Sequence, residues 1–258
     1  MKTVSTKPAL AAAVKAARAA GKIMRDNWHL PKRVNSAEAH DIKLELDVRC
    51  QKLIEKILRA VFPEIPLLGE EGYSGDMDAE FRWVVDPIDG TVNYFFGMPH
   101  AAVSIALEHR KKSVVAMIYD PFADEIWTTT KGEPTRLNGK IVRVSDRSKV
   151  GEAVIAMGFS KDRENLQKSL PHLIRISRRA KKIRILGSAA LELAYVASGR
   201  LDAYIERTIN LWDVAAGSLL VENAGGEFYT LPAPGGKLRM CADNGLLRKK
   251  LQVGSLLK

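Results

Sequence analysis

Cysteine and histidine are scarce in this sequence, and neither forms a recognisable metal-binding pattern. Only two of the 258 residues are cysteines, Cys50 and Cys241. Two cysteines are too few for a disulfide framework or a thiolate zinc site, which indicates a reducing compartment. The five histidines form no H-E-x-x-H pair. A bound metal would therefore have to be held by oxygen ligands.

Long apolar runs are also lacking. No stretch approaches the roughly 18 uninterrupted apolar residues that cross a bilayer. Residues 1–25 carry six basic side chains and no acidic one, which would suit a targeting segment. The spacing of Lys15, Arg18 and Lys22 favours an ordinary first helix instead. We therefore expect no membrane association and a cytoplasmic location.

The overall composition is that of a folded globular protein, with 46% hydrophobic and 27% charged residues. The length lies between the expectations for one domain and for two. No linker rich in proline, glycine or serine divides the chain. We predict one domain over residues 1–258, built from two tightly packed lobes at about residues 1–145 and 146–258.

The net charge of +10 makes an anionic partner or substrate plausible. Six basic residues lie within ten positions that contain no acid: Arg175, Arg178, Arg179, Lys181, Lys182 and Arg184. This run is either a surface for phosphate or nucleic acid or a solvated helix end. The solvated end is favoured, because no aromatic side chains are interleaved for stacking on bases.

Hydrophobic spacing predicts an α/β (α+β) fold. Apolar residues recur at helical spacing over residues 8–28 and again after Asp47, and β-branched runs from residue 83 onward predict strands. Asn138-Gly139 predicts a tight hairpin turn. Further helices are expected at residues 162–180, 189–198 and 214–224, between strands at 153–157, 183–186 and 202–206. This mixed order indicates a layered sandwich rather than a Rossmann sheet or a TIM barrel.

Residues 83–94 carry the most informative motif. An apolar strand delivers Asp86 and Asp89 onto a turn, where Pro87 fixes the backbone and Gly90 permits a tight bend. Both carboxylates can then aim at one point. The turn also exposes the Ile88 carbonyl as a ligand, and the amides of Gly90 and Thr91 can hold phosphate oxygens. Hard oxygen ligands of this kind suit Mg²⁺.

Two further acidic positions can extend this cluster. Glu70 lies in Gly69-Glu70-Glu71-Gly72, whose glycines allow a bend, and Asp213 lies where a helix begins. Alone, the first is most simply a surface pair and the second an N-cap.

The sequence resembles the inositol monophosphatase family, within the wider lithium-sensitive, magnesium-dependent phosphatase superfamily. The resemblance rests on GEEG at 69–72, WVVDPIDGTVNY at 83–94, LGSAALELAYVASGRLDAYIE at 186–206 and WDVAAGSLLVENAGG at 212–226. It covers nearly the whole chain. It implies an αβαβα sandwich of the inositol monophosphatase and fructose-1,6-bisphosphatase type. It also implies a homodimer that hydrolyses small phosphate monoesters with two or three Mg²⁺ ions.

The resemblance also implies roles for individual residues. The metal ligands are Glu70, Asp86, the Ile88 carbonyl, Asp89 and Asp213. Asp47 matches an acid near a metal-bound water, and Thr91 helps Glu70 to orient the attacking water. The substrate side is formed by Asp89, Gly90, Thr91, Gly187, Ser188, Ala189, Glu206 and Asp213, with Glu206 on the substrate hydroxyls. The N-terminal lobe would then bind metal and phosphate, and the C-terminal lobe the alcohol.

Metal catalysis agrees with the energetics. Phosphate-monoester hydrolysis needs accelerations of up to about 10²¹, and acid–base catalysis supplies only about 10² to 10⁴. We therefore expect direct in-line attack by a metal-activated water, with no covalent nucleophile. Asp89→Asn is expected to abolish turnover and to leave the fold intact.

Several alternatives stay open. Many relatives carry a lysine where this chain has Ser36, and Lys43 is a candidate replacement. Inositol 1-phosphate is the favoured substrate, with fructose 1,6-bisphosphate and histidinol phosphate as alternatives. The TVNY sequence at 91–94 argues against adenosine bisphosphates, because phosphatases of that class more often carry TKEF. A different class of function, association with RNA or the transcription machinery, would suit the basic run at residues 175–184.

Overall fold

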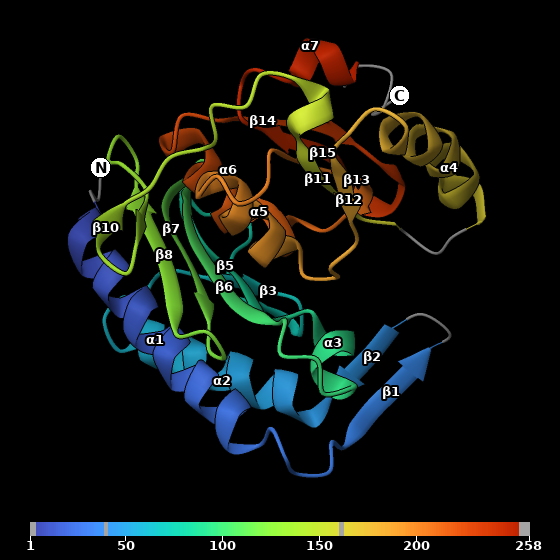
Figure 1. The fold of residues 1–258 in the computed structure, drawn as a ribbon. Coiled ribbons are helices and arrows are strands. Elements are labelled where there is room, and N and C mark those ends of the chain that lie inside the picture. The colour runs from blue at the N-terminus through green and yellow to red at the C-terminus, as the bar shows by residue number, and fades with distance from the viewer. Residues whose placement is uncertain (1–3, 39–40, 160–162, 253–258) are drawn as a thin grey trace.

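Helices and sheets alternate in five layers (Figure 1). The structure is a computed structural model that describes residues 4–38, 41–159 and 163–252. Three hydrophobic cores separate the layers: one under the first helices, one between the two sheets, and one under the outermost helices. This is the predicted αβαβα sandwich.

The first two layers are a helix pair and a large sheet. Helices α1 (Thr6–Asp26) and α2 (Glu45–Arg59) cover one face of an eight-stranded sheet. Buried alanines on α1 allow close approach, and a side chain at Gly21 would lie 2.5 Å from the Tyr119 ring. Across the sheet, the strands are β10 (Lys140–Ile141), β9 (Arg136–Leu137), β8 (Glu125–Thr130), β7 (Lys112–Asp120), β6 (Ala102–His109), β5 (Phe81–Asp89), β3 (Leu67–Gly69) and β4 (Gly72–Ser74).

The middle layer consists of α5 (Ala189–Ala197) and α6 (Leu211–Asn223), which lie between the two sheets (Figure 1). The two helices touch where Gly217 faces Leu193, since a Cβ at Gly217 would meet the Leu193 side chain at 2.4 Å. Both helices come from the C-terminal part of the chain and pack on the sheet formed by the N-terminal part. The two parts therefore share a continuous core.

The last two layers are a five-stranded sheet and the outer helices α4 (Arg163–Ser177) and α7 (Arg248–Leu251). The strands, in spatial order, are β12 (Lys182–Arg184), β11 (Val154–Met157), β13 (Ala203–Ile209), β15 (Leu238–Asp243) and β14 (Glu227–Pro232). Outside the layers lie the hairpin β1 (Val34–Glu38) and β2 (Asp41–Leu44), the short helix α3 (Thr91–Phe95), and 3₁₀ turns at Val150–Glu152 and Pro234–Gly236.

Most predicted elements are present, with shifted ends. The hairpin turn is confirmed, and Asn138 and Gly139 have φ angles of 47° and 81°. The helix expected after Asp47 is present as α2, but it begins earlier, at Glu45, and includes Asp47 in its first turn. Likewise β5 does not end before the two aspartates but runs through Asp89. The hairpin β1–β2 and the pair β14–β15 were not predicted.

Two further observations concern the cysteines and the apolar character of the helices. Both cysteines are buried and unpaired, as expected of small apolar residues. Within the described residues, no helix is both long enough and apolar enough to cross a membrane.

Candidate active site

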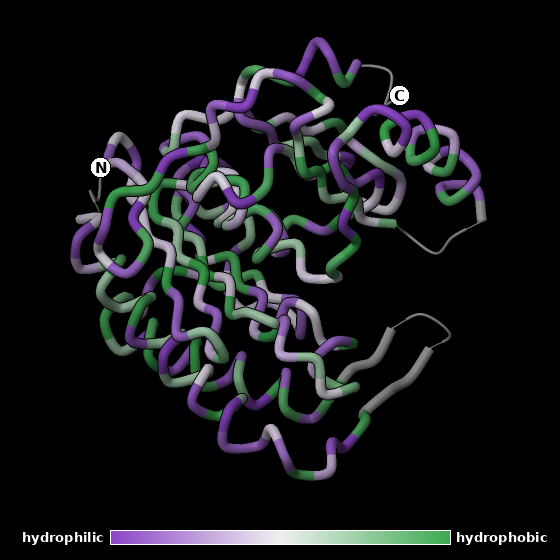
Figure 2. Tube along the Cα trace, in the orientation of Figure 1, coloured by the Kyte–Doolittle hydropathy of each residue, from purple (hydrophilic) through white to green (hydrophobic). Residues whose placement is uncertain are grey.

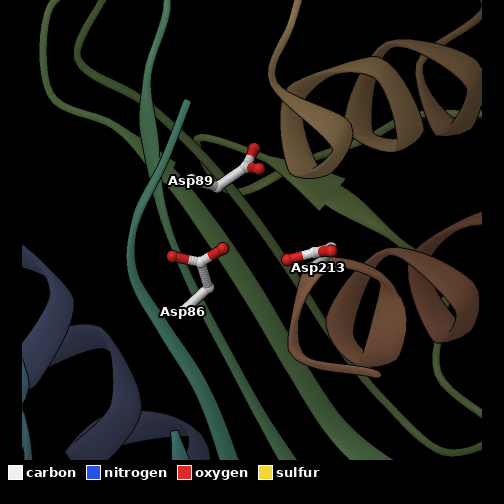
Figure 3. Close-up of side chains that lie close together, drawn as sticks. All are labelled: Asp86, Asp89 and Asp213. Atoms are coloured by element: carbon white, nitrogen blue, oxygen red, sulfur yellow. The ribbon is translucent and has the colours of Figure 1, made fainter. Parts of the chain in front are cut away.

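Three aspartates from two elements converge at one point. Asp86 and Asp89 come from β5 and Asp213 from the first turn of α6 (Figure 3). One carboxylate oxygen from each lies within 4.8 Å of the others. The Asp213 carboxylate also accepts the backbone N–H of Asn210 at 2.8 Å, so it caps α6 and faces the cluster at once.

A break in the strand register brings the two β5 aspartates together. Residues three apart on a regular strand point to opposite faces of the sheet. Pairing of β5 with β6 is irregular between Asp86 and Asp89, where Pro87 has no N–H to donate. The Ile88 N–H instead donates to the Asp86 carboxylate at 3.1 Å. Both side chains can therefore face α6, as the motif predicted.

Glu70 reaches the same cluster from the turn between β3 and β4. Strand β3 lies parallel to β5, and the Glu70 carboxyl hydrogen-bonds Asp86. The turn is fixed by Gln51 of α2, which donates to the Gly72 carbonyl at 3.1 Å and accepts the Glu71 N–H at 2.9 Å. Sequence analysis did not identify Gln51.

Asp47 lies behind the cluster, next to Thr91. One of its oxygens accepts the Leu44 N–H at 2.7 Å and so caps α2. The other lies 3.5 Å from the Thr91 hydroxyl, which also lies 2.8 Å from the Ile88 carbonyl. The structure therefore brings Asp47, Thr91 and Ile88 together.

The electrostatics of the cluster favour a bound cation. Burial raises the pKa of Glu70 to about 8, of Asp213 to about 7 and of Asp89 to about 6, and it also raises the pKa of Asp86. Neighbouring carboxylates raise the pKa values of Glu70, Asp86 and Asp213 further. Buried carboxylates this close are stable as anions only with positive charge between them. An all-oxygen set of four carboxyl groups and the Ile88 carbonyl fits Mg²⁺.

Comparisons with known proteins identify the family of this chain. Residues 5–250 match the model of the inositol monophosphatase family. The chain belongs to this family. A relative from Xylella fastidiosa named Nus factor SuhB is 40% identical over 225 residues, which cover 85% of this chain and 81% of the relative.

A plant relative and a solved structure extend the comparison. Inositol monophosphatase 2 of Solanum lycopersicum is 38% identical over 222 residues, covering 83% of this chain and 84% of the relative. The crystal structure of the extragenic suppressor protein suhB from Bartonella henselae superposes with a TM-score of 0.89 at 33% identity, covering 97% of this chain and 99% of that one. The similar proteins therefore include one named as an inositol monophosphatase and others named Nus factor SuhB or suhB.

The residues that we expect on the substrate side meet Asp89 at the start of α5. Asp89 accepts hydrogen bonds from the Ser188 hydroxyl and from the backbone N–H groups of Ala189 (3.2 Å) and Ala190 (2.9 Å). The α5 N-terminus thereby favours the charged form of this carboxylate. Ser188 and Ala189, expected beside the substrate, thus also hold Asp89 in place.

The turn after Asp89 fits tightly against two other segments. Gly90 has a φ of 87°, and a Cβ there would lie 2.8 Å from the His100 carbonyl, so only glycine fits. Asn93, also missed by sequence analysis, donates to the carbonyls of His100 (2.9 Å), Leu186 (2.8 Å) and Gly187 (3.2 Å). Its amide therefore ties α3 to the segment before α5.

The remaining predicted positions lie at the edges of the site. Glu206, near the middle of β13, interacts electrostatically with Asp89 and Asp213. Ser36 and Lys43 are directly paired across the β1–β2 hairpin. The proposed replacement of a family lysine by Lys43 stays a prediction.

Proposed function

We propose that the protein is a Mg²⁺-dependent phosphatase of a small sugar or polyol phosphate, with inositol 1-phosphate as the favoured substrate. The observation that carries the proposal is the convergence of Asp86, Asp89 and Asp213 within 4.8 Å, beside Glu70. Acidic clusters on surfaces are common, but here Asp86 and Asp89 are buried and the cluster is assembled from three separate segments of the chain.

Glu70, Asp86, the Ile88 carbonyl, Asp89 and Asp213 would hold two or three Mg²⁺ ions. When bound, Mg²⁺ acidifies water and offsets the charge of the phosphate dianion. The ligands are fixed before the metal arrives, since Asp89 is anchored on α5 and Asp213 on the Asn210 N–H. Preorganised ligands need little reorganisation on binding.

Thr91 and Asp47 would position the attacking water. The Thr91 hydroxyl has two acceptors beside it, the Ile88 carbonyl and Asp47. Its single proton is therefore directed to one of them, which leaves its lone pairs to accept a hydrogen bond from the water. Burial raises the pKa of Asp47 to about 7, which suits a group that receives a proton near neutral pH.

The phosphate would lie against the amides of Gly90 and Thr91, which begin α3 and have no partner within the helix. The alcohol would lie between Glu206 and residues 187–189. Fructose 1,6-bisphosphate and histidinol phosphate are the alternative substrates.

Phosphate release from these three esters and from 3′-phosphoadenosine 5′-phosphate, with and without Mg²⁺, tests the proposal. Glu70→Gln is the sharpest variant, because the amide can donate to Asp86 and relieves repulsion. Asp89→Asn is less informative than we expected from the sequence. The Asp89 carboxylate accepts hydrogen bonds from three donors, and the NH₂ group of an asparagine would face one of them. Metal-independent turnover, or full activity of Glu70→Gln, would refute the proposal.

We also propose that the protein forms a homodimer. Three large apolar side chains are exposed near the site, Phe96 at 69%, Met98 at 52% and Ile185 at 62%. The Asn93 side chain on α3 donates hydrogen bonds to the carbonyls of Leu186 and Gly187. The segment that carries Phe96 is therefore attached to the segment that follows Ile185. Sedimentation should show a dimer that Phe96→Asp weakens, and a monomeric wild-type protein would contradict the proposal.

A second candidate function, binding to RNA in a transcription complex, is supported by one surface. The basic end of α4 lies against α7, since Arg175 donates to the Leu251 carbonyl at 3.2 Å. Helix α7 adds Arg248, Lys249 and Lys250 to the predicted basic run, and it is coloured largely hydrophilic in Figure 2.

Titration of labelled RNA at several salt concentrations tests this candidate. If the surface binds RNA, replacing Arg178, Arg179 and Lys182 with Ser should weaken binding and flatten its salt dependence. The same substitutions at Lys15, Lys22 and Lys52 provide a control of equal charge change. Equal effects of the two triple variants would exclude the basic run.

A further inference from the structure

The carboxylate of Glu206 is held by a neighbour on its own strand. Tyr204 and Glu206 are two residues apart on β13, so their side chains lie on the same face of the sheet. The Tyr204 hydroxyl donates a hydrogen bond to Oε2 of Glu206. Tyr204 is only 1% exposed and packs in the core between the two sheets. A donor this firmly packed can fix the direction of the carboxylate.

The other side of the carboxylate rests on a glycine. Gly158 follows β11, and its N–H donates to the Ile205 carbonyl at 3.0 Å. A Cβ at Gly158 would lie 1.9 Å from Oε2 of Glu206 and 2.9 Å from Oε1. The carboxylate therefore occupies the space that any larger residue would fill. Gly158 has no positive φ angle, so the close approach is what requires glycine here.

A second buried acid, Glu192, interacts with Tyr204. Glu192 on α5 is 2% exposed, accepts the Leu186 N–H at 3.0 Å and interacts with the Tyr204 side chain. Leu186 begins the segment that Asn93 ties to α3. Glu192 therefore connects Tyr204, which holds Glu206, to the segment that leads into residues 187–189. Those residues are proposed to lie beside the alcohol.

Glu206 itself faces the metal cluster. Burial raises its pKa to about 8, the nearby carboxylates of Asp213 and Asp89 add to this, and the Tyr204 hydrogen bond is the strongest influence that favours the charged form. Loss of the hydroxyl would therefore change both the direction and the charge of the carboxylate.

We propose that Tyr204 is a positioning residue that holds Glu206 as the acceptor for hydroxyl groups of the substrate alcohol, with Gly158 and Glu192 as its supports. The proposal rests on the proposed phosphatase function and narrows it to alcohols with a hydroxyl group within reach of Glu206. A site built to bind a hydroxyl group discriminates strongly against esters that lack one. An aryl phosphate without hydroxyl groups would gain nothing from Glu206.

The test compares two esters in Tyr204→Phe. For each enzyme, kcat/KM is measured with p-nitrophenyl phosphate and with whichever polyol phosphate the wild type hydrolyses fastest. Removing the hydrogen-bond partner of a buried polar group is worth about a 10- to 100-fold change, so the polyol-to-aryl ratio of kcat/KM should fall by at least about 10-fold. Tyr229→Phe is the matched control, because Tyr229 donates to Glu227 on β14 in the same way but packs in the core under the outer helices, on the other face of the sheet from Tyr204. Its ratio should equal that of the wild type.

Two further variants keep the proposal refutable if Tyr204→Phe folds poorly. Gly158→Ala should lower the same ratio by displacing the carboxylate. Adding Tyr204→Phe to Glu206→Ala should cause no further loss, because the two residues act as one unit.

The outcomes separate this proposal from the proposed function. A wild-type protein that hydrolyses neither ester would refute both. Turnover of p-nitrophenyl phosphate alone, or an unchanged ratio in Tyr204→Phe and Gly158→Ala, would refute the positioning role and leave the phosphatase function standing.

Discussion

Replacing Asn93 with alanine should test how firmly the turn at Gly90 and Thr91, the proposed phosphate site, is attached to the second half of the chain. The Asn93 amide donates to three backbone carbonyls and is 9% exposed. Each hydrogen bond contributes about 1 kcal/mol, and a buried acceptor left unpaired costs more. We therefore expect Asn93→Ala to lower the free energy of unfolding by about 2–4 kcal/mol.

For a chain of this size, 1 kcal/mol corresponds to about 2–4 °C in the melting temperature, so the shift should be roughly 5–12 °C. Asn223→Ala is the matched control, because Asn223 donates to Thr129 Oγ1 (2.8 Å) and to the Thr130 carbonyl (2.9 Å), outside the candidate site. Both variants should melt earlier in calorimetry, but only Asn93→Ala should also lose kcat at 25 °C. A shift below about 2 °C, or equal activities of the two variants, would refute this reasoning.

Three further predictions concern buried groups. Burial raises the pKa of Glu192 from 4.5 to about 8, so the folded chain keeps a proton that the unfolded chain releases, and this contribution to stability falls as pH rises from 4.5 to 8. Glu192→Gln should remove this fall, which is worth up to about 1.4 kcal/mol of unfolding free energy per pH unit. Between pH 5 and pH 7, denaturant unfolding should therefore show a smaller loss of unfolding free energy in the variant than in the wild type. Gly69→Ala should cost about 2 kcal/mol by displacing the Gln51 amide, 2.2 Å from the new Cβ. The Gly69→Ala/Gln51→Ala double variant should be no less stable than the worse single variant, and additive losses would contradict this. Burial raises the pKa of the Cys50 thiol to about 12 and also raises that of Cys241. A thiol reagent should therefore label the two cysteines only after denaturation. Rapid labelling of the native protein would contradict their burial.

The parts of the site that could be predicted are those encoded locally. Asp86 and Asp89 lie three residues apart beside a proline, and Asp213 begins a helix within its own motif. The turn around Pro87 indicated that Asp86 and Asp89 can aim at one point. Asp213 was added to them only by the family resemblance. The layered fold could also be expected, since each strand and helix has its own hydrophobic spacing.

The parts that were missed depend on contacts between distant segments. Gln51 is an ordinary polar residue of α2 until β3 and β4 place Glu71 and Gly72 beside it. Strand β15 pairs with β13, a separate segment of the chain, and with β14, and the pairing with β13 cannot be read from the sequence of β15 itself. The Tyr204–Glu206 pair did leave a signal, because residues two apart on a strand share a face. That signal gains meaning only once Gly158 is placed opposite.

The most direct test of the central claim measures melting temperature and phosphate release in the same samples, with Mg²⁺ or with a chelator. Three proteins are compared: the wild type, Glu70→Gln, and Glu222→Gln at the opposite end of α6 from Asp213. We predict that Mg²⁺ stabilises the wild type and Glu222→Gln and switches on phosphate release in both. Glu70→Gln should melt higher than the wild type in chelator, gain little from Mg²⁺ and release no phosphate. Equal Mg²⁺ stabilisation and equal turnover in all three proteins would contradict the assignment of the carboxylate cluster as a catalytic metal site.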